Sequence, residues 1–181
     1  MTVRTLICLF DLPSYDRRVA PALRRYRSDY NPDAVIVQLR EVRRRKELDA
    51  DDSQHWIDSL APDAGYKPSE QTIRELANML VHGLCLVKLQ DMAPFVPWLS
   101  EQSEWFADLM QGGEELAGGR LEFTFGSGSL IATRQQIHQF LEVIRNAQPP
   151  ESAAQDYENL RGMLESADSN PNYTLLKTTV E

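Results

Sequence analysis

Several stretches of the chain have the hydrophobic pattern of β-strands. In residues 3–10 apolar side chains fall on both faces, as they do in a buried central strand. In residues 120–125 the hydrophobic side chains Leu121, Phe123 and Phe125 alternate with polar ones, so one face should be buried and the other solvated. The predicted strands are Val3–Phe10, Leu84–Leu89, Arg120–Phe125 and Tyr173–Val180.

A short Gly- and Ser-rich segment follows the third of these strands. Gly126–Ser129 contains only those two residue types, and Leu130–Ile131 then resumes the apolar pattern. Such a segment between two strand patterns favours a hairpin, which we predict here. The glycines could be mistaken for a phosphate-binding loop. That loop, however, leads from a strand into a helix N-terminus, whereas both flanks here have strand patterns.

Elsewhere apolar residues recur every three or four positions, which is typical of helices with one buried face. Helices are predicted over residues 15–30, 54–60 and 97–111, and others centre on Val35–Val42, Ile73–Leu80, Ile137–Ile144 and Ala153–Ala167. Pro21 predicts either a kink or a helix start near Ala20. The polar residues 47–53 are predicted to form a loop.

Capping residues mark several helix ends. Asn31-Pro32-Asp33 is a helix-start signal, although the β-branched residues after it are also typical of a strand; the helix is preferred. Ser69 is an expected N-cap, and Thr133 with Gln136 three residues later forms a capping box. Gly83 is expected to end the helix that Ser69 begins.

The order of these elements predicts the fold class. Strands and helices do not alternate regularly, and a hairpin comes late in the chain. We therefore expect an α+β fold, with one mixed or antiparallel sheet of about four to five strands and about six flanking helices. This differs from a doubly wound fold, which requires regular βαβ alternation.

Length and composition are those of a globular protein. A chain of 181 residues is expected to form one domain over residues 1–181, large enough for a core without metal ions or disulfides. With 42% hydrophobic and 25% charged residues it is neither disordered nor membrane-embedded. The first apolar run, Leu6–Phe10, is too short for a signal peptide, so we expect a cytoplasmic protein without membrane contact.

The two cysteines agree with that location. Cys8 and Cys85 both lie in aliphatic runs, where a thiol is usually a small buried hydrophobic group. Neither belongs to a C-x-x-C pair or has a base beside it in the sequence, so a structural role is favoured over a redox or catalytic role. A disulfide between them remains an alternative.

Charge is distributed unevenly along the chain. Residues 1–46 contain eleven of the nineteen Lys and Arg but only five of the Asp and Glu, a net charge of +6. The remaining residues, 47–181, carry −14, which gives −8 overall. A separation of charge on this scale produces a local field that attracts charged partners.

The basic part supplies the candidate binding residues. Four of them, Arg17, Arg18, Arg24 and Arg25, lie opposite the apolar stripe of the first basic helix. The others, Arg43, Arg44 and Arg45, follow one helix later. A guanidinium pairs bidentately with carboxylates and phosphates, and arginine is a frequent interface anchor. The simpler interpretation is a solvated helix face whose charges are matched by acids of this same chain.

Two functional hypotheses follow. The first is a non-enzymatic interaction module of the immunity, antidote, chaperone or adaptor type, whose arginines bind an acidic protein. The alternative is an enzyme acting on an anionic small molecule, with an arginine clamp and His55 or His138 as the base. Nucleic acid is an unlikely partner because phosphates repel the strongly acidic remainder of the chain. No oligomeric state is predicted.

The sequence motifs indicate no metal or cofactor. His82 and Cys85 form an H-x-x-C pair, but a zinc site needs four ligands and no second pair has suitable spacing. His82 is better placed to stabilise a helix C-terminus. The carboxylates of Asp49–Asp52 lack the glycine and the distal glutamate of a calcium loop. Trp98 and Trp105, seven residues apart, are more typical of a helix core than of a ligand platform.

Overall fold

The computed structural model describes residues 4–44, 50–60, 65–89, 98, 101, 103, 116, 118–124 and 129–180. The chain divides into two compact units. One, which we call the sheet unit, comprises Met1–Phe10, Leu86–Leu121 and Gly126–Glu181; the other, the helical unit, comprises Asp11–Cys85 and Glu122–Phe125. That residues 1–181 behave as a single domain stays a prediction.

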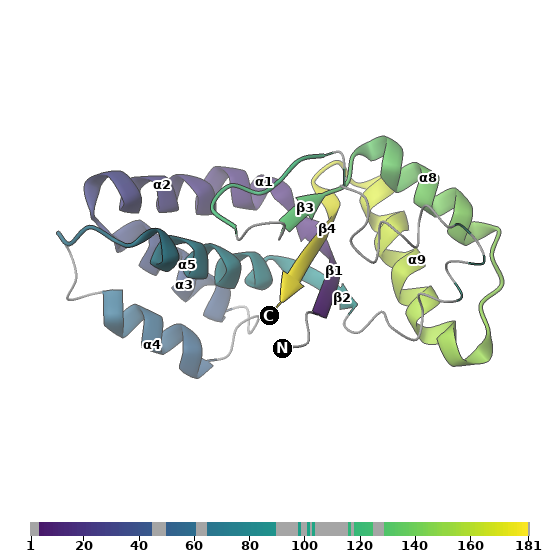
Figure 1. Cartoon of the computed structure of the whole chain (residues 1–181), viewed down its shortest axis with the longest axis horizontal. Coiled ribbons are helices and arrows are strands. Elements are labelled where there is room, and N and C mark those ends of the chain that lie inside the picture. The colour runs from purple at the N-terminus through teal and green to yellow at the C-terminus, as the bar shows by residue number, and fades with distance from the viewer. Residues whose placement is uncertain are drawn as a thin grey trace. The chain divides into compact units, whose positions relative to one another are not determined.

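The sheet unit contains the β-sheet. Its strands, β1 (Arg4–Asp11), β2 (Cys85–Leu89), β3 (Ser129–Ile131) and β4 (Tyr173–Val180), form an antiparallel sheet in the order β2-β1-β4-β3 (Figure 1). In the pairing of β3 with β4, Ser129 lies opposite Thr178 and Ile131 opposite Leu176. The apolar run Ile7–Phe10 in the central strand β1 is buried on both faces, as expected for a central strand. The predicted α+β class is confirmed.

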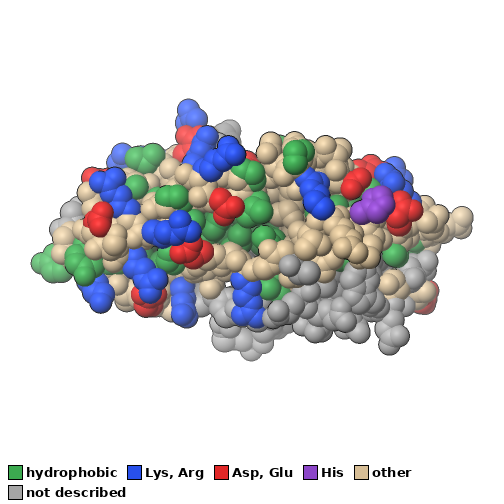
Figure 2. All heavy atoms as spheres, turned by 90° about the horizontal axis from the view of Figure 1, so that it is seen from above, with side chains coloured by type: hydrophobic (Ala, Val, Ile, Leu, Met, Phe, Trp, Pro, Cys, Tyr) green, Lys and Arg blue, Asp and Glu red, His purple; other side chains and the backbone are tan. Residues whose placement is uncertain are grey.

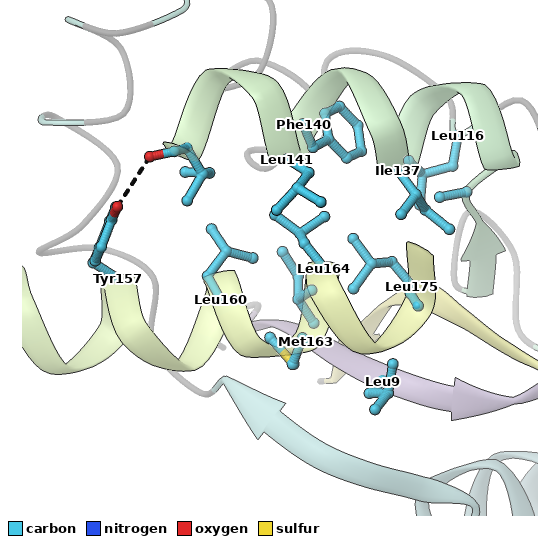
Figure 3. Packing of buried hydrophobic residues seen from close by; sticks show 14 of the residues in the cluster. Leu9, Leu116, Ile137, Phe140, Leu141, Tyr157, Leu160, Met163, Leu164 and Leu175 are labelled. Atoms are coloured by element: carbon cyan, nitrogen blue, oxygen red, sulfur yellow. Dashed lines mark hydrogen bonds between the residues drawn. The ribbon is translucent and has the colours of Figure 1, made fainter. Parts of the chain in front are cut away.

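Two helices of the sheet unit carry most of its core. They are α8 (Arg134–Arg145) and α9 (Ala154–Ser169), the latter preceded by a 3₁₀ turn at Glu151–Ala153. The predicted capping box begins α8, since Thr133 Oγ1 accepts from the N–H of Gln136. The apolar stripes of the two helices face each other, and the Tyr157 hydroxyl donates to the Ile144 carbonyl at 3.1 Å (Figure 3).

The helical unit begins with a continuous helical stretch. It runs through α1 (Leu12–Ser14), a π-helical turn (Tyr15–Val19) and α2 (Ala20–Asp29). Helical structure thus begins three residues before the predicted start at residue 15: Asp11 caps the first turn, its Oδ1 accepting from the N–H of Ser14 at 3.0 Å. Pro21 is the second residue of α2, directly after the π turn. The α-helical part of this stretch thus begins at Ala20, one of the two alternatives predicted for Pro21.

Three further helices complete this unit (Figure 1): α3 (Asp33–Arg44), α4 (Ala50–Leu60) and α5 (Glu70–Gly83). The helix preferred after Asn31 is confirmed, with Val35, Leu39 and Val42 buried. Ser69 caps α5 as expected. The loop predicted over residues 47–53 is wrong from Ala50 onward. Ser53 is buried one turn before the buried Ile57, so the buried face of α4 starts earlier than the apolar residues alone indicate.

The strand predicted at Arg120–Phe125 is not formed within the described residues. Arg120 makes only an isolated antiparallel bridge to Leu130, and Glu122 and Phe123 form a turn, in which Phe123 has a φ of 67°. The backbone beside β3 is instead that of residues 118–120, where Gly118 N–H donates to the Ile131 carbonyl at 2.9 Å. Glu122 belongs to the helical unit and contacts Arg24 and Tyr15 there, as described below, and these contacts compete with strand formation.

Two other predictions lie largely outside the described residues. Of the helix predicted at Pro97–Gln111, the structure describes three residues: Trp98 and Glu101 are helical, and Ser103 is not. Trp98 is buried, and its indole N–H donates to the Gln148 carbonyl at 3.1 Å, as befits a core tryptophan. The turn at Gly126–Gly128 is outside the described part. No helix of the described residues is long and apolar enough to span a membrane.

Candidate partner-binding surface

The predicted binding arginines lie on two segments of the helical unit. Arg17 and Arg18 belong to the π turn, Arg24 and Arg25 to α2, and Arg43 and Arg44 to α3. All six are exposed, whereas Arg45 lies outside the described residues. The opposite side of the first segment is held in the core by four side chains, Tyr15, Val19, Leu23 and Tyr26. The sequence therefore predicted correctly which side of the helix faces solvent.

Arg24 is bound to an acid of the chain itself. Its Nε lies 3.0 and 2.9 Å from the two carboxylate oxygens of Glu122, and its Nη2 also donates to Oε2. This is a bidentate guanidinium–carboxylate pair between residues 98 positions apart. The hydrogen bond to Glu122 is the main reason that the pKa of Arg24 is raised. The position at which Arg24 can bind a carboxylate is thus occupied by Glu122 of the same chain.

Three more of the predicted arginines have partners nearby. Arg25 lies 3.7 Å from Asp29, Arg44 lies 3.0 Å from Glu41, and Arg43 donates to the Gln54 side chain. The side chains of Arg25 and Asp29 are 64% and 58% exposed, so their ion pair is worth about 1 kcal/mol at most. Such pairs exchange readily with a partner's carboxylates. Figure 2 shows this mixture of basic and acidic side chains over the helical unit.

Arg17 and Arg18 form no ion pair or hydrogen bond with the described residues. The same holds for Arg40, which sequence analysis did not select. Arg40 is exposed on α3, one turn from Arg44 and one turn from Val37, whose exposure of 56% is large for an apolar residue. A helical wheel centred on the buried stripe of α3 would have found Arg40, because it lies opposite that stripe.

Arg18 lies beside a small hollow between the π turn and α3. The hollow has an empty volume of about 270 Å³, part of it open to solvent. It is lined by Ser14, Arg18, Val19, Gln38, Glu41, Val42 and Leu84. Arg18 therefore extends the basic surface from the first helical segment to α3. The hollow is smaller than the pockets that hold most small-molecule ligands.

The enzyme hypothesis required an arginine pocket that also contains a histidine and an acid. Neither the hollow beside Arg18 nor the depression that contains Trp56 and Tyr66 has a histidine in its lining. His138 lies in the sheet unit, exposed and 3.8 Å from Asp168. His55 is exposed on α4.

The cysteines are not free thiols. Both are buried, and both are disulfide-bonded. The sequence favoured buried free thiols and left a disulfide as the alternative, and the structure has the disulfide. The cysteines therefore no longer support a reducing compartment. In the described part of the chain no group of three or more His, Cys, Asp or Glu is placed to hold a metal ion.

No protein-family model, curated protein or solved structure matches this chain. A function therefore has to be argued from the arginine surface itself.

Proposed function

We propose that this protein is a non-enzymatic interaction module that binds an acidic protein through the arginines of the π turn, α2 and α3. The observation that carries the proposal is the exposure of Arg17, Arg18 and Arg40 without an acidic partner among the described residues. Immunity or antidote proteins, chaperones and adaptor subunits are the kinds of protein that act in this way. Charge complementarity would mainly accelerate association and set specificity.

The proposed binding surface uses only some of the arginines in the basic residues 1–46. Arg24, Arg25 and Arg44 already have carboxylates of the chain beside them, so only part of the positive charge is uncompensated. Acids also lie within the surface, including exposed Asp16 next to Arg17. This mixture suits a protein partner with its own pattern of charges better than the uniform phosphate charge of nucleic acid. A cytoplasmic location remains part of the proposal.

Binding of poly-L-glutamate tests the proposal without knowledge of the natural partner. We expect binding at about 50 mM salt that weakens steeply toward about 200 mM, since the contacts are electrostatic. The double variant R17A/R18A and the single variant R40A should bind more weakly. The matched control for R40A is R145A, which removes an exposed arginine of the sheet unit and changes the net charge by the same amount.

Two results would overturn the proposal. One is the absence of binding by the unmodified protein at low salt. The other is an equal loss of binding in R145A and R40A, which would indicate a response to net charge alone. A DNA duplex serves as the comparison ligand. Tighter binding of DNA than of poly-L-glutamate would favour a nucleic-acid partner instead.

A further inference from the structure

We infer that Glu122 occupies, within the free protein, the position at Arg24 that a carboxylate of the acidic partner takes in the complex. This inference rests on the proposed function and adds to it a specific point of recognition. Arg24 would be a specificity residue for a carboxylate, and the Glu122 segment would compete with the partner for that residue.

The first support is the geometry of the pair. Both carboxylate oxygens of Glu122 lie within 3.0 Å of the Arg24 Nε, and Nη2 binds one of them as well. This is the arrangement in which arginine recognises a carboxylate from another molecule. The second anchor of the segment is the Tyr15 hydroxyl, which donates to the Glu122 backbone carbonyl. The side chain of Glu122 can therefore leave while its backbone stays in place.

The second support is the conformation of the neighbouring residue. Phe123 has a φ of 67°, in the left-handed region, which is unfavourable for a residue other than glycine. Its ring lies under the guanidinium of Arg27, with Cζ 6.0 Å from the ring centroid. Contacts with α2 therefore hold the segment in place against its local preference. The backbone of this segment therefore stays in place, and the partner's carboxylate competes only with the side chain of Glu122 for Arg24.

The third support is exposure. The side chains of Arg24 and Glu122 are 58% and 43% exposed, so an incoming carboxylate can reach the guanidinium. An exposed ion pair of this kind changes affinity by a factor of about five at most. Arg24 also lies seven residues, about two helical turns, after Arg17. A partner docked on Arg17 can thus contact Arg24 along the same helical segment.

The test compares E122Q with E70Q. Glu122 and Glu70 each pair with an arginine of α2 and have similar exposure, and Arg27, the partner of Glu70, is not a predicted binding residue. Both variants change the net charge by the same amount. Glutamine at position 122 leaves the backbone carbonyl available to Tyr15, so the fold should be retained, which circular dichroism verifies.

We expect E122Q to bind poly-L-glutamate about two- to fivefold more tightly than the unmodified protein, and E70Q to show a clearly smaller gain. The gain should disappear when R24A is added to E122Q. Equal gains in E122Q and E70Q, or a gain that persists without Arg24, would overturn the inference while leaving the proposed function intact if R17A/R18A still weakens binding. Absence of binding in every variant would overturn both.

Discussion

Gly83, the last residue of α5, lies against Val42 of α3 so closely that a β-carbon at position 83 would overlap the Val42 Cγ1 and lie 3.1 Å from its Cβ. The sequence suggested that Gly83 ends the helix through its conformational freedom. Its φ is not in the left-handed region, and the glycine is instead required by the close approach of two helices.

We therefore expect G83A to lower the free energy of unfolding by about 1–3 kcal/mol, because an inserted methyl group overpacks this contact. Truncation of its neighbour should restore part of the loss, so that V42A/G83A is less destabilised than the sum of the single variants. Chemical denaturation measures each value. G162A is the control: Gly162 lies in α9 with no atom near its missing Cβ, and alanine there should add about 0.5–1 kcal/mol. Additive losses for positions 42 and 83 would contradict this account.

Tyr15 should make stability depend on pH in alkaline solution. Burial raises the pKa of its phenol, and the charges of Glu122 and Asp16 raise it further, whereas Arg24 lowers it. Above the ordinary tyrosine pKa of about 10 the unfolded chain releases this proton while the folded protein retains it. The folded state consequently loses stability as the pH rises beyond about 10, and none of this effect is present at neutral pH.

The substitution Y15F isolates that effect. At neutral pH it should cost about 0.5–1.5 kcal/mol, because the hydrogen bond to the Glu122 carbonyl is lost. Above about pH 10 the difference between the two proteins should shrink or reverse, since phenylalanine has no proton to release. Urea unfolding of both proteins between neutral pH and about pH 11 provides the measurement. A constant difference over the whole range would show that Tyr15 does not titrate in this way.

The disulfide-bonded cysteines predict how the protein reacts with thiol reagents before and after reduction. Because both are disulfide-bonded, the denatured but unreduced protein should react with no thiol reagent, and reduction should release both thiols. Mass spectrometry after alkylation counts them. Reduction should also lower the free energy of unfolding by about 2–4 kcal/mol. Two reactive thiols before reduction would restore the first interpretation, that of buried free cysteines.

Two helix caps test whether residues 1–181 unfold as one domain. Ser69 caps α5 in the helical unit and Thr133 caps α8 in the sheet unit. Each alanine substitution should cost about 1 kcal/mol. In a single cooperative domain both S69A and T133A shift one common transition, measured alike by far-UV circular dichroism and tryptophan fluorescence. If instead each variant shifts a different phase, the two units unfold independently.

Local rules accounted for most of the helices and strands. The capping box at Thr133, the N-cap at Ser69 and the buried stripe of α3 all depend on residues a few positions apart, so the sequence displays them directly. The Arg120–Phe125 strand failed for the opposite reason. Its alternation was clear, but the contacts of Glu122 with Arg24 and Tyr15 come from a distant segment and outweigh a local strand preference.

The sequence alone determined that the arginines face solvent, because the apolar stripe of each helix must turn toward the core. Only the tertiary structure decided which arginines remain uncompensated. Glu122 follows Arg24 by 98 positions and Glu70 follows Arg27 by 43, so these neutralising pairs are visible only once the chain has folded. Charge along a sequence is a sum over positions, whereas the field at a surface depends on distances of a few ångströms.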